Sequence, residues 1–157
     1  MKKNPMKKLL LMFCIWFKSS ASYAACTAGL VATSSGGISF GNYSANSASD
    51  KTMNGTVTAN CTLGGTLPSF TIALSTGGSN TFLSRTMNLL VVNTLDYNIY
   101  TTNGYTTVWG DGTNSTVTQS YGGGSGSVNF TAYGKIPTGQ YVLPGAYGDS
   151  ITITVTY

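Results

Sequence analysis

The last eight residues of the chain, Ser150–Tyr157, alternate strictly between polar and apolar side chains. One face carries Ile151, Ile153, Val155 and Tyr157, and the other carries Ser150, Thr152, Thr154 and Thr156. A two-residue period is typical of a β-strand with one buried face. A strand needs a neighbour on each side, because its N–H and C=O groups are otherwise left unpaired at a sheet edge. The terminal segment therefore predicts a fold that contains at least one amphipathic sheet.

The same period recurs further up the chain. Apolar residues alternate with mostly polar ones in four more segments, which are 56–62, 70–75, 95–100 and 128–133. The run NLLVV (88–92) is continuous and predicts a strand buried on both faces. Turn-forming clusters separate these segments, and the glycine-rich one at 121–127 is predicted to be a hairpin loop. With no convincing helix and no linker, the sequence predicts a single all-β sandwich domain over residues 25–157.

The first 24 residues have the three parts of a secretory signal peptide. MKKNPMKK is the basic start, Leu9–Phe17 is a run of nine apolar residues, and KSSASYA is a small, polar tail. Nine residues are too few to span a membrane, which takes about 20. Ser22 and Ala24 fit a small-x-small cleavage pattern, so we expect the mature chain to begin at Ala25 and to be exported.

Cleavage would remove Cys14 and leave Cys26 and Cys61 as the cysteines of the exported chain. An even number of cysteines in an oxidising compartment predicts a structural disulfide between them, stapling the first strand to the second. Two free buried thiols are one alternative. A lipid attached to Cys26 is another, although Tyr23 stands where a lipoprotein signal has leucine.

The charge of the chain is concentrated in its signal segment. The whole sequence carries a net charge of +4, yet five of its eight basic residues lie within the first 18. After residue 24, three basic residues face four acidic ones, a net charge of −1. This balance argues against binding of nucleic acid or another polyanion.

The residue types also argue against an enzyme and predict no cofactor and no metal site. The chain has no histidine, which excludes Ser-His-Asp and Cys-His catalysis. Its four acids are single aspartates at positions 50, 96, 111 and 149, so no carboxylate pair is evident. The segment GDGTN (110–114) resembles a calcium loop, but one aspartate favours an Asx-type turn.

Aromatic residues are the remaining candidates for binding. Tyr105, Trp109 and Tyr121 lie in turn-rich segments and are candidates for an adhesive loop that contacts sugars or an apolar surface. The alternative is that they close the ends of the core.

Together, the motifs resemble the spore coat protein U-like domain. The segments that carry the resemblance, in order, are ISFGNY (38–43), FTIALSTG (70–77), SRTMN (84–88), LDYNIYTT (95–102), VWGDG (108–112), FTAYGKIPTGQ (130–140) and GAYGDSITITVTY (145–157). They cover essentially the whole chain after the signal segment. Members of this family resemble the subunits of archaic chaperone–usher pili or a secreted spore-coat component.

The resemblance implies an immunoglobulin-like, pilin-type sandwich that lacks its final strand. A periplasmic chaperone and then a neighbouring pilus subunit would fill the resulting groove by strand addition, with an outer-membrane usher assembling the pilus. Ile151, Ile153, Val155 and Tyr157 would form one groove wall. We further expect Arg85 to pair with Asp96 or Asp149.

The start of the mature chain departs from the pattern of a polymerising subunit. A donor needs roughly ten alternating residues before its first strand, given a rise of about 3.3 Å per residue. Only Ala25 precedes Cys26 after the expected cleavage. We therefore expect an acceptor that gives no strand, as a tip or minor subunit at the cell surface, in contact with an abiotic or host surface. The alternative is a stand-alone spore-coat or cell-surface protein, or a carbohydrate-binding module, with a self-complete sandwich.

Overall fold

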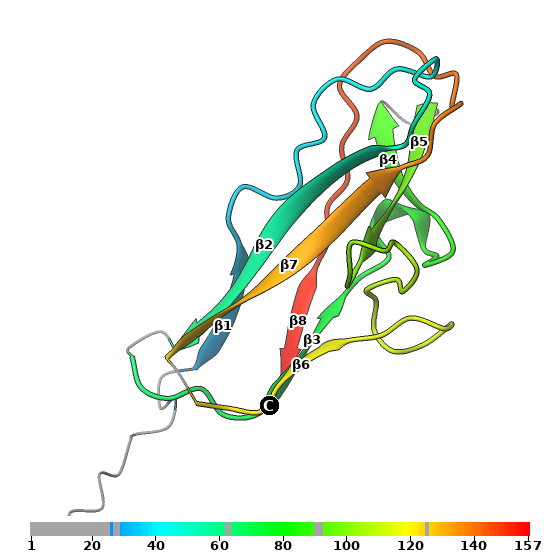
Figure 1. Cartoon of the computed structure of the whole chain (residues 1–157). Helices are drawn as coiled ribbons and strands as arrows, with labels where there is room; N and C mark the ends of the chain where they lie inside the picture. Colours follow the sequence, from blue (N-terminus) through cyan, green and yellow to red (C-terminus); the bar gives the residue numbers. More distant parts are fainter. Residues whose placement is uncertain (1–25, 27–28, 62–63, 90–92, 125) are drawn as a thin grey trace, which may run out of the picture.

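The structure is a computed structural model that describes residues 26, 29–61, 64–89, 93–124 and 126–157. The predicted signal peptide therefore lies outside the described residues. The elements are strands β1 (Leu30–Ser34), β2 (Lys51–Cys61), β3 (Phe70–Leu74), β4 (Arg85–Leu89), β5 (Asn93–Tyr100), β6 (Gln119–Tyr121), β7 (Ser127–Ile136) and β8 (Ile153–Thr156), with one short 3₁₀ turn, η1 (Gly77–Ser79) (Figure 1). Within the described ranges, no helix is long and apolar enough to cross a membrane.

The strands form two antiparallel sheets packed face to face. The larger sheet has the order β1-β2-β7-β5-β4 and the smaller one has the order β6-β3-β8. The longest pairing joins β2 to β7, from Lys51 opposite Ile136 to Asn60 opposite Ser127. In Figure 1 these two strands run side by side across the front, with the smaller sheet behind them. The predicted all-β sandwich of two antiparallel sheets is confirmed.

The core comes from the alternating faces that the sequence predicts. Val57, Ala59 and Cys61 of β2 are buried against residues of the same period in β3 and β5, which are Phe70, Ile72, Leu74, Leu95, Tyr97 and Ile99. In the terminal segment Ile151, Ile153 and Val155 are half-buried, whereas the intervening threonines are exposed. The pleat places successive side chains on opposite faces, so this local signal is enough to orient each strand.

Two local predictions come out differently. The glycine-rich segment 121–127 is no hairpin loop, because β6 pairs with β3 in the smaller sheet while β7 pairs with β2 and β5 in the larger one. The connection therefore crosses between the sheets. Of the predicted strand NLLVV, Asn88 and Leu89 end β4, and the other three residues lie outside the described part of the chain.

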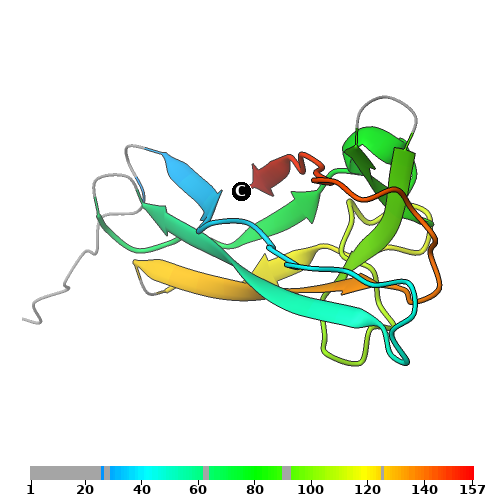
Figure 2. The ribbon, with the colours of Figure 1, turned by 90° about the horizontal axis from the view of Figure 1, so that it is seen from above.

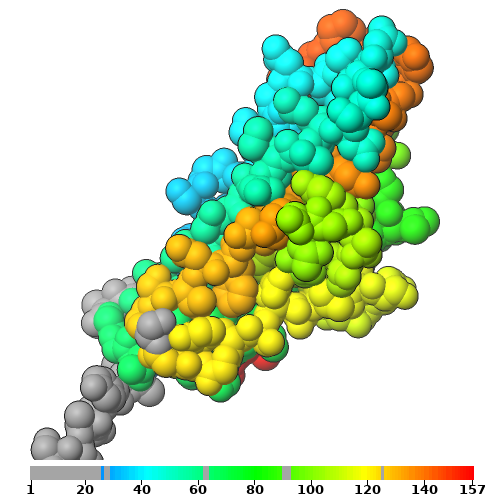
Figure 3. Space-filling model, in the orientation of Figure 1, coloured from blue at the N-terminus to red at the C-terminus, as the bar shows by residue number. Residues whose placement is uncertain are grey.

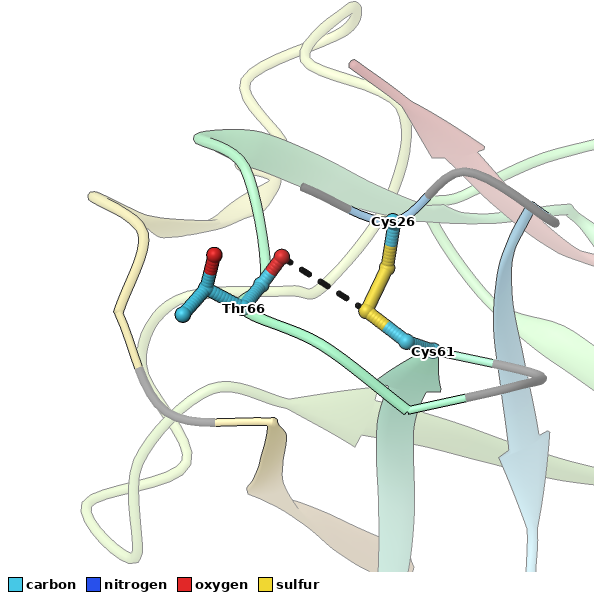
Figure 4. The surroundings of a disulfide bond; sticks show 3 residues. All are labelled: Cys26, Cys61 and Thr66. Atoms are coloured by element: carbon cyan, nitrogen blue, oxygen red, sulfur yellow. Dashed lines mark hydrogen bonds between the residues drawn. A yellow bond between two sulfur atoms is a disulfide. The ribbon is translucent and has the colours of Figure 1, made fainter. Parts of the chain in front are cut away.

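The predicted disulfide between Cys26 and Cys61 is confirmed, with the two Cα atoms 5.4 Å apart (Figure 4). It ties the segment before β1 to the end of β2, where Leu30 pairs with Cys61. The Sγ atom of Cys61 lies 3.6 Å from the carbonyl oxygen of Thr66. Since the sulfur of Cys26 is engaged in this bond, it is not free to carry a lipid.

Candidate functional site

The edge strands β1, of the larger sheet, and β8, of the smaller sheet, lie next to each other on one side of the sandwich. Strand β8 pairs with β3, from Leu74 opposite Ile153 to Thr71 opposite Thr156, and β1 pairs with β2. No strand of the described chain pairs with the other edge of either one. β1 and β8 contact each other, and Figure 2 shows them next to one another with no strand between them. In Figure 3, which looks onto the side of β2 and β7, the terminal strand is almost entirely hidden.

A groove of about 300 Å³ opens at the end of these edges, where β1 finishes at Ser34 and β8 begins at Ile153. One wall is the segment after β1, with Ile38 and Phe40, and the other is the segment before β8, with Ile151 and Ile153. Its floor is mostly apolar and includes Val57, Leu74, Met87, Tyr97, Ile99 and Ala132. The floor comes from both sheets, so the groove opens directly into the core.

The first wall exists because the chain leaves the edge of the larger sheet at two glycines. Gly36 and Gly37 have φ angles of 76° and 64°, in the left-handed region that glycine enters without steric cost. After this bend, Ile38 packs over Gly55, and Phe40 packs over Gly134. A Cβ at Gly134 would lie 2.7 Å from Cζ of Phe40, so the missing side chain makes room for the ring.

The second wall is held by a backbone bridge to β4 and by hydrogen bonds to a side chain. Gly148 exchanges two backbone bonds with Asn88, with N···O distances of 2.8 and 3.2 Å. The carboxylate of Asp149 accepts bonds from the N–H groups of Gly78 and Ser150, at 2.9 and 2.8 Å. The hydroxyl of Tyr97 donates to the same carboxylate at 2.7 Å. Burial and this neighbouring carboxylate raise the pKa of Tyr97 well above its ordinary value, so it stays a neutral donor.

Arg85 lies fully buried behind this wall, and the predicted ion pair with Asp96 or Asp149 is wrong. Its Nε and one terminal nitrogen donate to the carbonyl of Ser75, at 2.9 and 2.8 Å. It also donates to the carbonyl of Trp109 and to Oδ1 of Asn98. Burial lowers the pKa of Arg85. The Arg85 guanidinium is thus hydrogen-bonded by neutral carbonyl and amide oxygens, where the sequence suggested a carboxylate partner.

The residues predicted for the groove wall take up three different environments. Ile151 and Ile153 line the groove. Val155 is half-buried against the core beside Ile72, and Tyr157 is 68% exposed at the end of the chain. The sequence reasoning missed the opposite wall, although Ile38 and Phe40 already show a two-residue period in ISFGNY.

The three aromatic residues predicted for an adhesive loop do not lie on one surface. Trp109 is fully buried, and its indole N–H donates to the carbonyl of Ile72 at 3.0 Å, so the expectation of a surface role is corrected. Tyr121 belongs to β6 and packs against Phe70, with ring centroids 5.5 Å apart. Tyr105 packs edge-on against Tyr100 and is half-buried.

A second hollow lies between residues 38–45 and 140–147. It shares Ile38, Phe40, Met87 and Tyr147 with the groove. On its rim, Tyr141 is 82% exposed and Leu143 is 59% exposed. Sequence reasoning did not single out either residue, because a lone exposed apolar side chain in a loop carries no periodic signal.

Two of the aspartates, Asp111 and Asp50, bind neighbouring loop and strand residues. No group of three or more potential metal ligands occurs in the described part of the chain. Asp111 accepts bonds from the backbone N–H and the hydroxyl of Thr113, which is the predicted Asx-type turn. Asp50 forms an ion pair with Lys135 at 3.4 Å and accepts a bond from the N–H of Thr138.

Comparison with known families identifies this architecture. The sequence model of the Spore Coat Protein U domain matches residues 16–154. The chain belongs to the Spore Coat Protein U domain family. A search of curated protein sequences found no match to this chain.

Among solved structures, the family member is similar to the CsuC–CsuE chaperone–tip adhesion subunit pre-assembly complex from archaic chaperone–usher Csu pili of Acinetobacter baumannii. The identity is 15% and the TM-score is 0.46. The match covers 81% of this chain and 40% of the chain in the solved structure. This chain therefore spans less than half the length of the solved one.

Proposed function

We propose that this protein is a structural subunit of an archaic chaperone–usher pilus, and that the groove between β1 and β8 accepts a β-strand from another polypeptide. The observation that carries the proposal is the pair of open strand edges on either side of an apolar floor. Unpaired edges of this kind bind an added strand through backbone hydrogen bonds. Every second side chain of the added strand then packs into the apolar floor.

Energetics favour an occupant with the period of a strand. Such an occupant would bury every second side chain against the floor residues, such as Leu74, Met87 and Ile99, and leave the others in solvent. Each fully buried aliphatic side chain contributes about 1.5–3 kcal/mol, which offsets the freedom that the occupant loses on binding.

The partners follow from the family resemblance. A periplasmic chaperone would fill the groove after export, and a neighbouring subunit would replace it at an outer-membrane usher. We place the assembled protein on a pilus at the cell surface, after removal of residues 1–24 as a signal peptide.

Our finer proposal is that this subunit accepts a strand but gives none, as a tip or minor subunit would. Cys26 and β1 support it, because Cys26 is bonded to Cys61 and β1 pairs with β2, so both belong to the fold of this subunit itself. Mass spectrometry of the exported protein tests the proposal. A mature chain that begins at Ala25 agrees with it, and one that retains an apolar stretch before Ala25 contradicts it.

Adhesion is the second part of the proposal. Tyr105 stays a candidate for surface contact, and the exposed Tyr141 and Leu143 add a second one. We expect Tyr141→Ala with Leu143→Ser to lower retention of assembled pili on polystyrene without changing their number. Tyr105→Ala tests the other candidate separately in the same assay.

A self-complemented chain tests the acceptor role. An alternating Val/Thr strand, joined to Tyr157 through a flexible Gly/Ser linker, should fold back into the groove and raise the melting temperature by at least 10 °C. A matched chain with the apolar positions changed to serine should melt like the unextended one. Equal melting of all three, with a monomeric unextended chain, would instead indicate a self-complete coat-like protein.

A further inference from the structure

The groove wall opposite β1 includes a short stretch, residues 149–152, that belongs to no strand. Strand β8 begins only at Ile153, yet Ile151 already lines the groove. Among the described residues, no backbone hydrogen bond involves Ile151, whereas Gly148 before it and Thr152 after it are bonded to Asn88 and Ser75. Its backbone groups are therefore free to pair with an incoming strand, but the pairing that would keep them in place is missing.

Two side-chain clamps flank Ile151. On one side, the carboxylate of Asp149 is held by three donors, which are Gly78 N, Ser150 N and the hydroxyl of Tyr97. The fit is close, because a Cβ at Gly77 would overlap this carboxylate. Hydrogen bonds to an ionised acceptor are about twice as strong as neutral ones.

On the other side, Ser75 binds Thr152 twice. Its N–H donates to the carbonyl of Thr152 at 3.0 Å, and its hydroxyl oxygen accepts from the N–H of Thr152 at 2.9 Å. The carbonyl of Ser75 is in turn held by two donors from the buried Arg85. Burying a charged group without an ion pair costs free energy, which hydrogen bonds must offset. Arg85 therefore depends on the Ser75 carbonyl as an acceptor, and the two residues fix each other.

We infer that Asp149 and Ser75, the latter fixed by Arg85, are positioning residues that keep the wall around Ile151 in its strand-accepting place while the groove is empty. This inference rests on the proposed function, since it concerns the same groove. The incoming strand then meets a preformed edge instead of ordering one as it binds. If only a fraction of the molecules has an ordered wall, the observed affinity falls by that fraction.

Association kinetics with a defined peptide test the inference. The probe is a fluorescein-labelled peptide of about ten residues that alternates valine with threonine and carries a lysine at each end, a length that spans about 33 Å. We expect Asp149→Ala to slow association at least tenfold and to leave dissociation within twofold. Asp149→Asn keeps an oxygen for the two N–H donors and should stay within threefold of the original rate. The control is Asp111→Ala, since within the described residues the Asp111 side chain binds only Thr113 of its own turn.

Hydrogen exchange supplies a second readout that a general loss of stability does not reproduce. In the empty groove of Asp149→Ala, the amides of Gly78, Ser150 and Thr152 should exchange at least tenfold faster, while those of β2 and β7 keep their rates. Ser75→Ala leaves the carbonyl that Arg85 binds and removes only the hydroxyl, so it should slow association severalfold even if Asp149→Ala fails to fold.

The outcomes separate the two proposals. If the unaltered chain does not bind the peptide, the acceptor function is wrong and the positioning role falls with it. If the unaltered chain binds and both variants associate at its rate, only the positioning role is overturned. Faster dissociation with unchanged association would also overturn it, because Asp149 would then be a contact of the bound strand.

Discussion

Gly134→Ala tests whether the groove wall depends on the glycine beneath it. The added methyl carbon would lie 2.7 Å from Cζ and 3.0 Å from Cε1 of Phe40, and 2.9 Å from Cγ2 of Ile38. Ordinary contact begins at 3.4 Å, so the ring must move by about 0.7 Å. Phe40 is only 6% exposed and packs edge-on against Tyr97, with ring centroids 6.1 Å apart.

The steric and backbone contributions to stability have opposite signs here. Overpacking of this kind costs about 1–3 kcal/mol, whereas replacing glycine by alanine in an extended strand gains about 0.4–1 kcal/mol from the unfolded chain. We expect a net loss of about 1–2 kcal/mol in the free energy of unfolding. Gly148→Ala is the matched control, because Gly148 also lines the groove but an added Cβ would meet no atom within 4 Å. It should be neutral or slightly stabilising.

Urea unfolding followed by the fluorescence of the buried Trp109 measures both variants. A double-mutant cycle then identifies the cause. In a Phe40→Leu background, where the clashing ring atoms are gone, Gly134→Ala should cost at least about 1 kcal/mol less than in the original chain. The reasoning is refuted if Gly134→Ala is as stable as the original chain, or if its cost is the same in both backgrounds.

Three further predictions concern the disulfide, the groove and the acid response. Replacing Cys26 and Cys61 together by serine should lower the free energy of unfolding by about 4 kcal/mol, given a closed loop with a sequence separation of 35, and reductant should then have no effect. Ile153→Asp should abolish co-purification with a strand-donating partner, because it places an unpaired charge in the groove, whereas Thr154→Asp on the exposed face should not. Asp50 has a pKa below its ordinary 3.8, chiefly because the N–H of Thr138 binds it and further because of Lys135. Its stabilisation is therefore complete above pH 3.8 and lost as the pH falls through the lower, folded-state pKa, so acid titration of Asp50→Asn should show a shallower loss, and an unchanged slope would count against this contact.

Much of the fold was predictable because its signals are local. A two-residue period needs only neighbouring positions, and it correctly oriented Val57 and Ala59, the β3 and β5 residues, and the terminal strand. The disulfide was predictable for another reason, since two cysteines in an exported chain leave one pairing. The absence of histidine and the charge balance likewise depend on composition alone.

The partners of Arg85 and the burial of Trp109 could not be predicted in this way. Arg85 binds Ser75, Asn98 and Trp109, which are brought together by strands of different sheets. Trp109 lies in a turn-rich segment whose backbone bonds to both Ile99 and, through Gly110, Leu74. A turn composition indicates a change of direction but does not state whether the turn passes over the core or away from it.

The sequence by itself determined that the chain forms amphipathic strands, that its cysteines pair and that its last strand has one apolar face. Only the tertiary structure decided what lies beside that strand. It placed β3 on one edge and left the other edge facing β1 across an apolar groove. The physical reason is that strand pairing is non-local, because any two amphipathic strands can share a ladder. Which ones do so depends on how all the faces are buried together.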